Sequence, residues 1–163
     1  MTLQHSDLKN INILPLGLSS VSIKATFLQD DLTSATGTLE TENIPWVEQY
    51  LNGSAKKIFV NTTTIDEVIT NPPNPSFVKI DVEGHEVEVL QGAKKILNQE
   101  KPVLLVESFP PKQKKVIKHL QNIDYQIFDA DRTSSVSEKT HNFFAWHPSG
   151  PLDSKDIKKV LSA

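Results

Sequence analysis

Two acidic residues, separated by one valine, stand near the middle of the chain directly after a short apolar segment. Asp81 and Glu83 follow residues 77–80, and Gly84 comes next. Two carboxylates at the end of a strand can bind a metal ion, act as a base toward a hydroxyl group, or hold a ribose or an amine. Open α/β sheets bind ligands at the carboxyl ends of their strands, and Gly84 permits a tight bend into a helix. The segment therefore predicts a strand, an acidic turn and a helix that form a binding site.

The polar residues of this segment have competing interpretations. Glu83, Glu86 and Glu88 all favour the first turns of a helix through its dipole, and we expect Glu86 and Glu88 to have only that role. Asp81 is the first polar residue after a buried strand, which makes it the stronger functional candidate. His85 is a candidate general base, although a histidine at the start of a helix is more often a surface or capping residue. The catalytic candidates in this turn are therefore Asp81, Glu83 and His85.

A fourth catalytic candidate, Glu107, ends the most continuous apolar run of the chain, residues 102–106. A buried carboxylate without a partner is costly, so we expect Glu107 either to pair with Lys79 or to have a function. The histidines show no spacing typical of metal ligands, and no serine and histidine arrangement indicates a hydrolase triad. Cysteine is absent, which excludes disulfides and thiolate sites. We expect no metal site.

Size and composition favour one domain. The 163 residues, 37% of them hydrophobic, are enough for one core. The formal net charge of −3 argues against nucleic-acid binding, and the lysine clusters are expected on solvated helix faces. No apolar run approaches the roughly 20 residues that span a bilayer, and the first residues lack the basic and apolar parts of a secretory signal. We expect a cytoplasmic protein without a membrane span.

The order of the predicted elements indicates an α/β fold. Strands and helices alternate in the middle of the chain, which is typical of a mostly parallel, doubly wound sheet, and the last two strands can close it with one antiparallel member. Thr64, with Glu67 three residues later, forms a capping-box pattern. We expect strands at 11–16, 21–27, 57–61, 77–80, 102–107, 125–128 and 142–146, helices at 45–51, 65–69, 85–98, 112–122 and 154–161, and loops at 29–43 and 129–141.

A resemblance to the FkbM family of S-adenosylmethionine-dependent methyltransferases is carried by Lys79-Ile80-Asp81-Val82-Glu83-Gly84-His85-Glu86, followed by Val89-Leu90 and Gly92-Ala93. Segments 10–20, 63–67 and 102–107 resemble the family in the same order, so the resemblance runs from about residue 8 to residue 147. It implies a Rossmann-like fold and methyl transfer to a hydroxyl group of a small molecule, a sugar or a lipid.

The resemblance also implies roles for single residues. It places Leu18 and Ser19 on the adenine side of the S-adenosylmethionine cofactor, and Asp81 and Val82 near the methyl group and the acceptor. The acceptor pocket itself is expected to be built from loops such as 29–43 and 129–141.

Two features of the family are missing from this sequence. One is a first strand leading into an Asp-x-Gly-Ala-Asn-like turn for the cofactor, and the other is a second strand ending in an acid for its ribose. We therefore expect residues 1–163 to form a single, incomplete methyltransferase domain that lacks the first two strands, with a gap of roughly 14 Å beside strand 77–80. Residues 11–16 then pair with that strand, pair with 21–27, or receive the missing strands from a second copy or another partner chain.

The function predicted from these features is that of a methyltransferase-like protein, weak or inactive alone because the glycine-rich turn is absent, with Asp81 at the tip of an interior strand between parallel neighbours. The alternative is a non-catalytic α/β remnant or interaction module with the same fold. A third interpretation, a phosphatase that forms a phosphoaspartate, rests on the similarity of residues 81–84 to an Asp-x-Asp-Gly turn. It is disfavoured because the second acid is a glutamate and no later paired acids supply a magnesium site.

Overall fold

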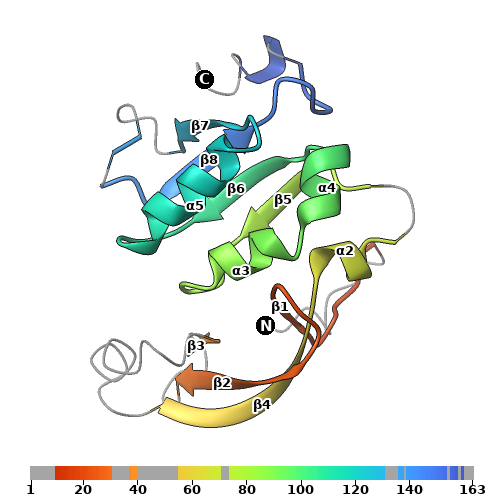
Figure 1. The fold of residues 1–163 in the computed structure, drawn as a ribbon, viewed down its shortest axis with the longest axis vertical. Coiled ribbons are helices and arrows are strands. Elements are labelled where there is room, and N and C mark those ends of the chain that lie inside the picture. The colour runs from red at the N-terminus through yellow and green to blue at the C-terminus, as the bar shows by residue number, and fades with distance from the viewer. Residues whose placement is uncertain are drawn as a thin grey trace.

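The computed structural model describes residues 10–30, 37–39, 55–70, 74–130, 136–137, 139–153, 155–157 and 159. They form two four-stranded sheets, with strand orders β1-β4-β2-β3 and β5-β6-β8-β7. In Figure 1 the first sheet lies below the second, and helix α2 (Ile65–Val68) lies between them. Two pairings are parallel, β1 with β4 and β5 with β6, and the other four described pairings are antiparallel. The fold is thus mixed α/β, and the prediction of a mostly parallel, Rossmann-like sheet is not confirmed.

The first sheet is built on one long antiparallel pair. β2 (Lys24–Asp30) lies antiparallel to β4 (Ala55–Thr63) along its whole length. The short strands β1 (Gly17–Leu18) and β3 (Gly37–Thr38) flank this pair, β1 parallel to the end of β4 and β3 antiparallel to β2. The strand predicted at 21–27 is shifted toward the C-terminus, because pairing with β4 sets its limits more strongly than its own apolar alternation.

The predicted strand at 11–16 does not form. Ile13 and Leu14 are each 53% exposed, and Pro15 lacks the N–H group that a strand ladder requires. Pairing with β4 begins only at Gly17. Neither of the two pairings expected for residues 11–16 within the chain, with the central strand or with 21–27, is therefore present among the described residues.

The second sheet contains the central motif. β5 (Phe77–Ile80) runs parallel to β6 (Val103–Glu107), and β8 (Asn142–Trp146) lies antiparallel between β6 and β7 (Gln126–Asp129). The strands predicted at 77–80 and 142–146 are confirmed, and β8 is the single antiparallel member that the sequence predicts. β5 has one parallel neighbour and is an edge strand of the described sheet. The expectation of an interior strand before Asp81 is therefore wrong for the residues that the structure describes.

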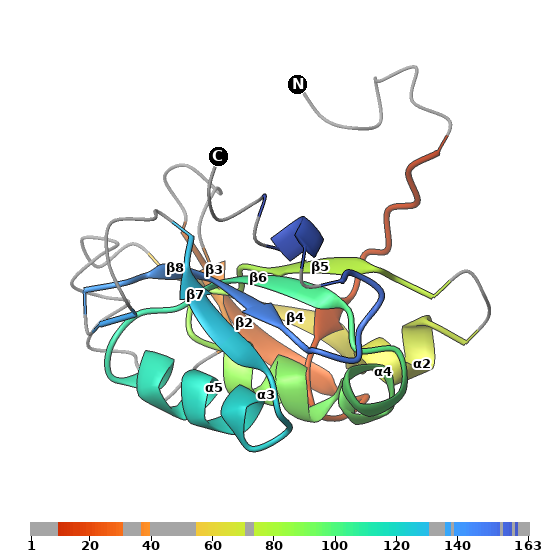
Figure 2. The ribbon, with the colours of Figure 1, turned by 90° about the horizontal axis from the view of Figure 1, so that it is seen from above.

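Three helices cover one face of the second sheet: α3 (Glu86–Gln91), α4 (Lys94–Gln99) and α5 (Lys112–Gln121) (Figure 2). The prediction for α5 is confirmed. The single helix predicted over 85–98 is instead divided into α3 and α4.

Asp66, in α2, explains this division. Its carboxylate oxygens accept the N–H groups of Lys95 at 2.8 Å and Ile96 at 3.0 Å, which a continuous helix would donate to carbonyls one turn earlier. The carbonyl of Gly92 accepts the N–H of Asp66 at 3.1 Å instead of an N–H from the next helical turn. α2 itself begins with the predicted capping box. The segment between the two sheets thus also caps α4.

The main core lies between the second sheet and its helices. Its most deeply buried side chains are Val89, Leu90, Leu104, Val106, Val116, Leu120, Phe143 and Ala145. The opposite face of the sheet holds a smaller cluster of Val103, Trp146 and Ile157. Both faces of β6 are therefore covered, as its continuous apolar run predicts.

Other predictions fall at the margins of the described ranges. Residues 155–157 and 159 are helical, within the helix predicted at 154–161. The helix predicted at 45–51 and most of the loop at 29–43 lie outside the described residues. Among the helices that the structure does describe, none has the length and apolar character needed to cross a bilayer.

Candidate functional site

The central motif forms a sharp turn between β5 and α3. Glu83 has φ 49° and Gly84 has φ 98°, so both lie in the left-handed region. Glycine adopts this conformation freely, whereas a non-glycine residue there is unfavourable by about 1–3 kcal/mol. Asp81 is exposed at the start of the turn, and its Oδ2 accepts a hydrogen bond of 2.7 Å from Lys79 Nζ, which raises the pKa of Lys79. Lys79 is thus paired with Asp81 rather than with Glu107.

Side chains from other elements hold the backbone of this turn. Thr38 Oγ1, on β3, donates to the carbonyl of Glu83 at 2.8 Å. Lys112 Nζ, at the start of α5, donates to the carbonyl of Gly84 at 2.6 Å. The carboxylate of Glu86 accepts the N–H of Gly84 at 2.7 Å. The shape of the turn therefore depends on residues of both sheets and their helices.

Glu86 has a role that the sequence analysis missed. Its side chain is 1% exposed, and its second carboxylate oxygen accepts the hydroxyl of Ser108 at 3.1 Å. Burial raises the pKa of Glu86, although its hydrogen bonds oppose this effect. The hydrogen bonds of the buried Glu86 therefore connect the turn after β5 to Ser108, the residue after β6. The available signal was Ser108, since the carboxyl ends of adjacent parallel strands meet at one edge of a sheet.

His85 occupies the N-cap position of α3, but it is buried rather than on the surface, and its side chain does not cap the helix. It is 9% exposed. Its Nε2 lies 2.9 Å from Ser19 Oγ, and its Nδ1 lies 3.7 Å from Glu88 Oε2. The imidazole is thus held between the segment that follows β1 and the helix α3.

A cleft of about 790 Å³ opens beside the turn. The turn lines one part of the cleft, and all four strands of the first sheet, together with the segment before β1, line the rest. Three of the four residues predicted to bind the cofactor, Leu18, Asp81 and Val82, line this cleft. Ser19 is not among the lining residues; it is buried, and its hydroxyl meets His85.

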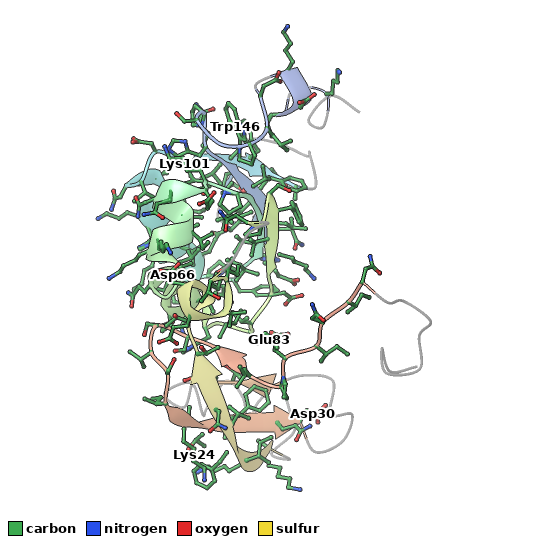
Figure 3. The ribbon with its side chains drawn as sticks, turned by 90° about the vertical axis from the view of Figure 1, so that its right-hand side faces the viewer. Lys24, Asp30, Asp66, Glu83, Lys101 and Trp146 are labelled. Carbon is green, nitrogen blue, oxygen red and sulfur yellow. The ribbon has the colours of Figure 1, made fainter. Side chains whose placement is uncertain are left out.

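Glu83 lies where the two sheets meet, between the labelled residues of the first sheet and those of the second (Figure 3). Burial raises the pKa of its carboxyl, and the charges of Asp81, Glu107 and Glu86 raise it further. Glu107 lines neither the cleft nor the smaller cavity described next. The structure therefore brings Asp81, Glu83 and His85 together at the cleft, while Glu107 acts on Glu83 through its charge.

A second cavity, of about 160 Å³, shares Glu83 with the cleft and is called the small pocket below. It is lined by Thr38, Glu83, Gly84, Phe109, Pro110, Pro111 and Lys112. Most of these residues follow β6, whereas the acceptor pocket is predicted in the loops at 29–43 and 129–141. Among the described residues of those loops, Thr38 alone lines the small pocket. For the residues that follow β6, their position directly after a central strand was the signal that could have found them.

The chemistry available at these two cavities is proton transfer and polar binding. A carboxyl of raised pKa and a buried imidazole can each accept a proton from a hydroxyl group. The described residues contain no group of three histidine or acidic side chains placed to hold a metal ion.

Comparison with known proteins gives two findings. The family model for the methyltransferase FkbM domain matches residues 3–127. Among solved structures, the methyltransferase FkbM from Methylobacillus flagellatus KT is similar to this chain, with 17% identity and a TM-score of 0.49. That match covers 83% of this chain but only 28% of the Methylobacillus chain, so this chain spans little more than a quarter of its length. No curated protein matches.

Proposed function

This chain belongs to the FkbM methyltransferase family, and on that premise we propose that it serves methyl transfer from S-adenosylmethionine to a hydroxyl group of a small molecule, a sugar or a lipid. The observation that carries the proposal is the position of the turn 81–85. It follows β5 at the carboxyl end of the parallel pair β5 and β6, where open α/β sheets bind ligands, and it lines the cleft.

The cleft partly suits the cofactor. Its volume of about 790 Å³ lies within the range of small-molecule sites. Leu18 and Val82 offer apolar surface, and the Asp81 carboxylate can accept hydrogen bonds from ribose hydroxyls or an amine. The sequence has six glycines, and no two of them are close enough to form a glycine-rich turn. The proposal therefore includes weak cofactor binding by this chain alone.

The residues at the cleft have separate roles in this proposal. The bound cofactor supplies an electrophilic methyl group. Glu83 accepts the proton of the acceptor hydroxyl, since its raised pKa suits a general base better than that of an ordinary glutamate. Asp81 orients the cofactor at the mouth of the cleft. His85, held by Ser19, keeps the wall of the cleft in place and is a second proton acceptor.

The two sheets are proposed to form one domain. The hydrogen bond from Thr38 to the Glu83 carbonyl and the hydrogen bond between Ser19 and His85 cross between them. Asp66 of α2, the helix between the sheets, accepts the N–H groups of Lys95 and Ile96 of α4. Within the described residues no strand pairs with the outer edge of β5, and Phe77 on that strand is 51% exposed. An unpaired edge favours association, so the proposal includes a second copy or a partner chain that adds strands there. Analytical ultracentrifugation tests this part, and a monomer at all concentrations would contradict association between copies.

Calorimetric titration with S-adenosylmethionine tests the proposal as a whole. We expect measurable binding weaker than about micromolar, and a further loss in Asp81→Asn, because the amide cannot replace a charged acceptor. Asp156→Asn is the matched control, since Asp156 is 53% exposed in its side chain and is no part of the cleft.

Methyl transfer is then measured with labelled S-adenosylmethionine and a set of hydroxyl acceptors. No binding at millimolar cofactor would favour the alternative of a non-catalytic interaction module. Equal binding by the wild type and Asp81→Asn would remove Asp81 from the cofactor site and leave the family membership untouched.

A further inference from the structure

We propose that the small pocket binds the acceptor and selects a hydroxyl compound built on a single six-membered ring. This inference rests on the proposed function, because it takes Glu83 as the group that accepts the hydroxyl proton. Glu83 lines both the small pocket and the cleft, so an acceptor in one cavity is adjacent to a cofactor in the other.

The size of the small pocket sets the first limit on the acceptor. Its volume is about 160 Å³. An apolar protein cavity of roughly 150 Å³ binds benzene, so one six-membered ring fills a space of this size. A lipid chain or a second sugar would have to lie outside the pocket. The volume therefore favours a single ring at the position of the reacting hydroxyl.

The walls of the small pocket set the second limit. Phe109, Pro110 and Pro111 present three rings with apolar faces in one short segment. Phe109 is 43% exposed, and its ring lies against that of His141, with the ring centroids 4.5 Å apart. Ring faces of this kind pack against a flat aromatic ring or against the C–H face of a saturated ring. The segment after β6 thus offers a platform for a ring rather than for a flexible chain.

The charges around the small pocket have both signs. Lys112 Nζ donates to the carbonyl of Gly84, and Thr38 Oγ1 donates to the carbonyl of Glu83, so both polar neighbours serve the backbone of the turn. Asp81 and Glu107 place further negative charge near Glu83 and raise the pKa of its carboxyl. Lys112 carries a positive charge at the same pocket, so these charges set no limit on the charge of the acceptor. The pocket therefore suits a ring alcohol or phenol by its size and its walls.

The transfer that this geometry serves is balanced in atoms and charge. The acceptor oxygen forms the new C–O bond while the S–C bond of the cofactor breaks, and the electron pair of that bond stays on sulfur. Glu83 takes the hydroxyl proton, and the cofactor leaves as a neutral thioether. No oxidant or reductant is needed.

Binding measured without cofactor tests the pocket directly. Phenol, cyclohexanol and methyl glucopyranoside are titrated separately into the 15N-labelled chain and followed by amide shifts in NMR spectra. We expect at least one of them to shift the amides of Gly84, Phe109 and Lys112. Phe109→Ala is expected to weaken that binding about tenfold, from the loss of a ring contact of about 1.4 kcal/mol. The three probes distinguish an aromatic, an aliphatic and a sugar ring.

Two control variants make the result specific. Phe59→Ala removes an aromatic ring from β4 that is 71% exposed and lies outside the small pocket, so binding should not change. Phe109→Tyr keeps a ring and should retain binding. If Phe109→Ala does not fold, the shift map of the wild type decides alone, and shifts confined to residues outside the pocket would overturn the inference.

The outcomes also separate this inference from the proposed function. Ring binding that Phe109→Ala weakens, with no binding of S-adenosylmethionine at millimolar concentration, would support the pocket and contradict the methyltransferase role. Methyl transfer to open-chain alcohols that Phe109→Ala leaves unchanged would support the methyltransferase and overturn the pocket. Absence of shifts with all three probes would overturn the pocket as well.

Discussion

Replacement of Glu86 tests whether a buried carboxylate holds the motif turn. Its side chain is 1% exposed, and its two oxygens accept the Gly84 N–H at 2.7 Å and the Ser108 hydroxyl at 3.1 Å. Each buried donor left without an acceptor destabilises the folded state by about 1–3 kcal/mol. Because Glu86→Ala leaves the buried Ser108 hydroxyl and the part-buried Gly84 N–H without their acceptors, we expect it to lower the free energy of unfolding by about 2–5 kcal/mol.

The pH dependence of Glu86→Gln isolates the effect of charge. Burial raises the pKa of Glu86 above its ordinary value of 4.5, so the folded state holds the proton more tightly than the unfolded chain does. The stability contributed by Glu86 is therefore fully present below pH 4.5 and is lost as the pH rises through the raised pKa. Glutamine keeps an oxygen that can accept the Gly84 N–H, and it is neutral at every pH. The stability of Glu86→Gln relative to the wild type is thus expected to increase over that pH range.

Urea unfolding of both variants and the wild type, followed by circular dichroism between about pH 4 and pH 8, measures these differences. Glu100→Gln is the matched control, since Glu100 follows α4 and is no part of the turn. The control is expected to keep the pH dependence of the wild type. A free energy of unfolding of Glu86→Ala within about 0.5 kcal/mol of the wild-type value would refute the role of Glu86 in holding the turn. If the difference in free energy of unfolding between Glu86→Gln and the wild type does not change with pH, burial does not raise the pKa of the Glu86 carboxyl.

Two further predictions concern the contacts that join the sheets. Gly92→Ala would place a Cβ 2.1 Å from the carbonyl oxygen of Ser19. We therefore expect urea unfolding to show a free energy of unfolding lower by about 1–3 kcal/mol. Gly17→Ala is the control, because its Cβ would meet ordinary contacts at 3.4 Å and should change the stability little. Asp66→Ala removes the cap of α4 and should lower the free energy of unfolding by about 1 kcal/mol, with faster amide exchange in the first turn of α4. Asp156→Ala, at an exposed residue, serves as the control. Equal amide exchange in the two variants would contradict the capping role of Asp66.

The elements that are determined by residues close together in the sequence could be predicted from the sequence alone. The apolar runs at 77–80 and 142–146 and the capping box at Thr64 are all local signals, and each one is confirmed. The strand at 11–16 could not be judged in this way. Its apolar residues, including Ile13 and Leu14, are half-exposed, because a strand forms only where another strand accepts its hydrogen bonds.

The candidate site shows the same division between local and long-range signals. Asp81 and Glu83 were placed at the end of a strand because an apolar run followed by acids is readable in the sequence. The burial of Glu86 was not readable, since it depends on Ser108, which is 22 residues away. The break between α3 and α4 was equally hidden, because the carboxylate that causes it belongs to Asp66, 29 residues before Lys95.

The first sheet is best understood as part of the site and not as an addition to it. A left-handed conformation at Glu83 persists only where surrounding groups fix it, and the carbonyl of that residue accepts its bond from Thr38 of β3. Lys112 holds the next carbonyl from the side of the second sheet, and Glu86 holds the N–H between them. Glu83 is therefore positioned by both sheets at once, at the point where the cleft and the small pocket meet. A change that loosens the β2 and β4 pair should consequently disturb the turn before it disturbs the main core, since the contact through Thr38 reaches the turn directly.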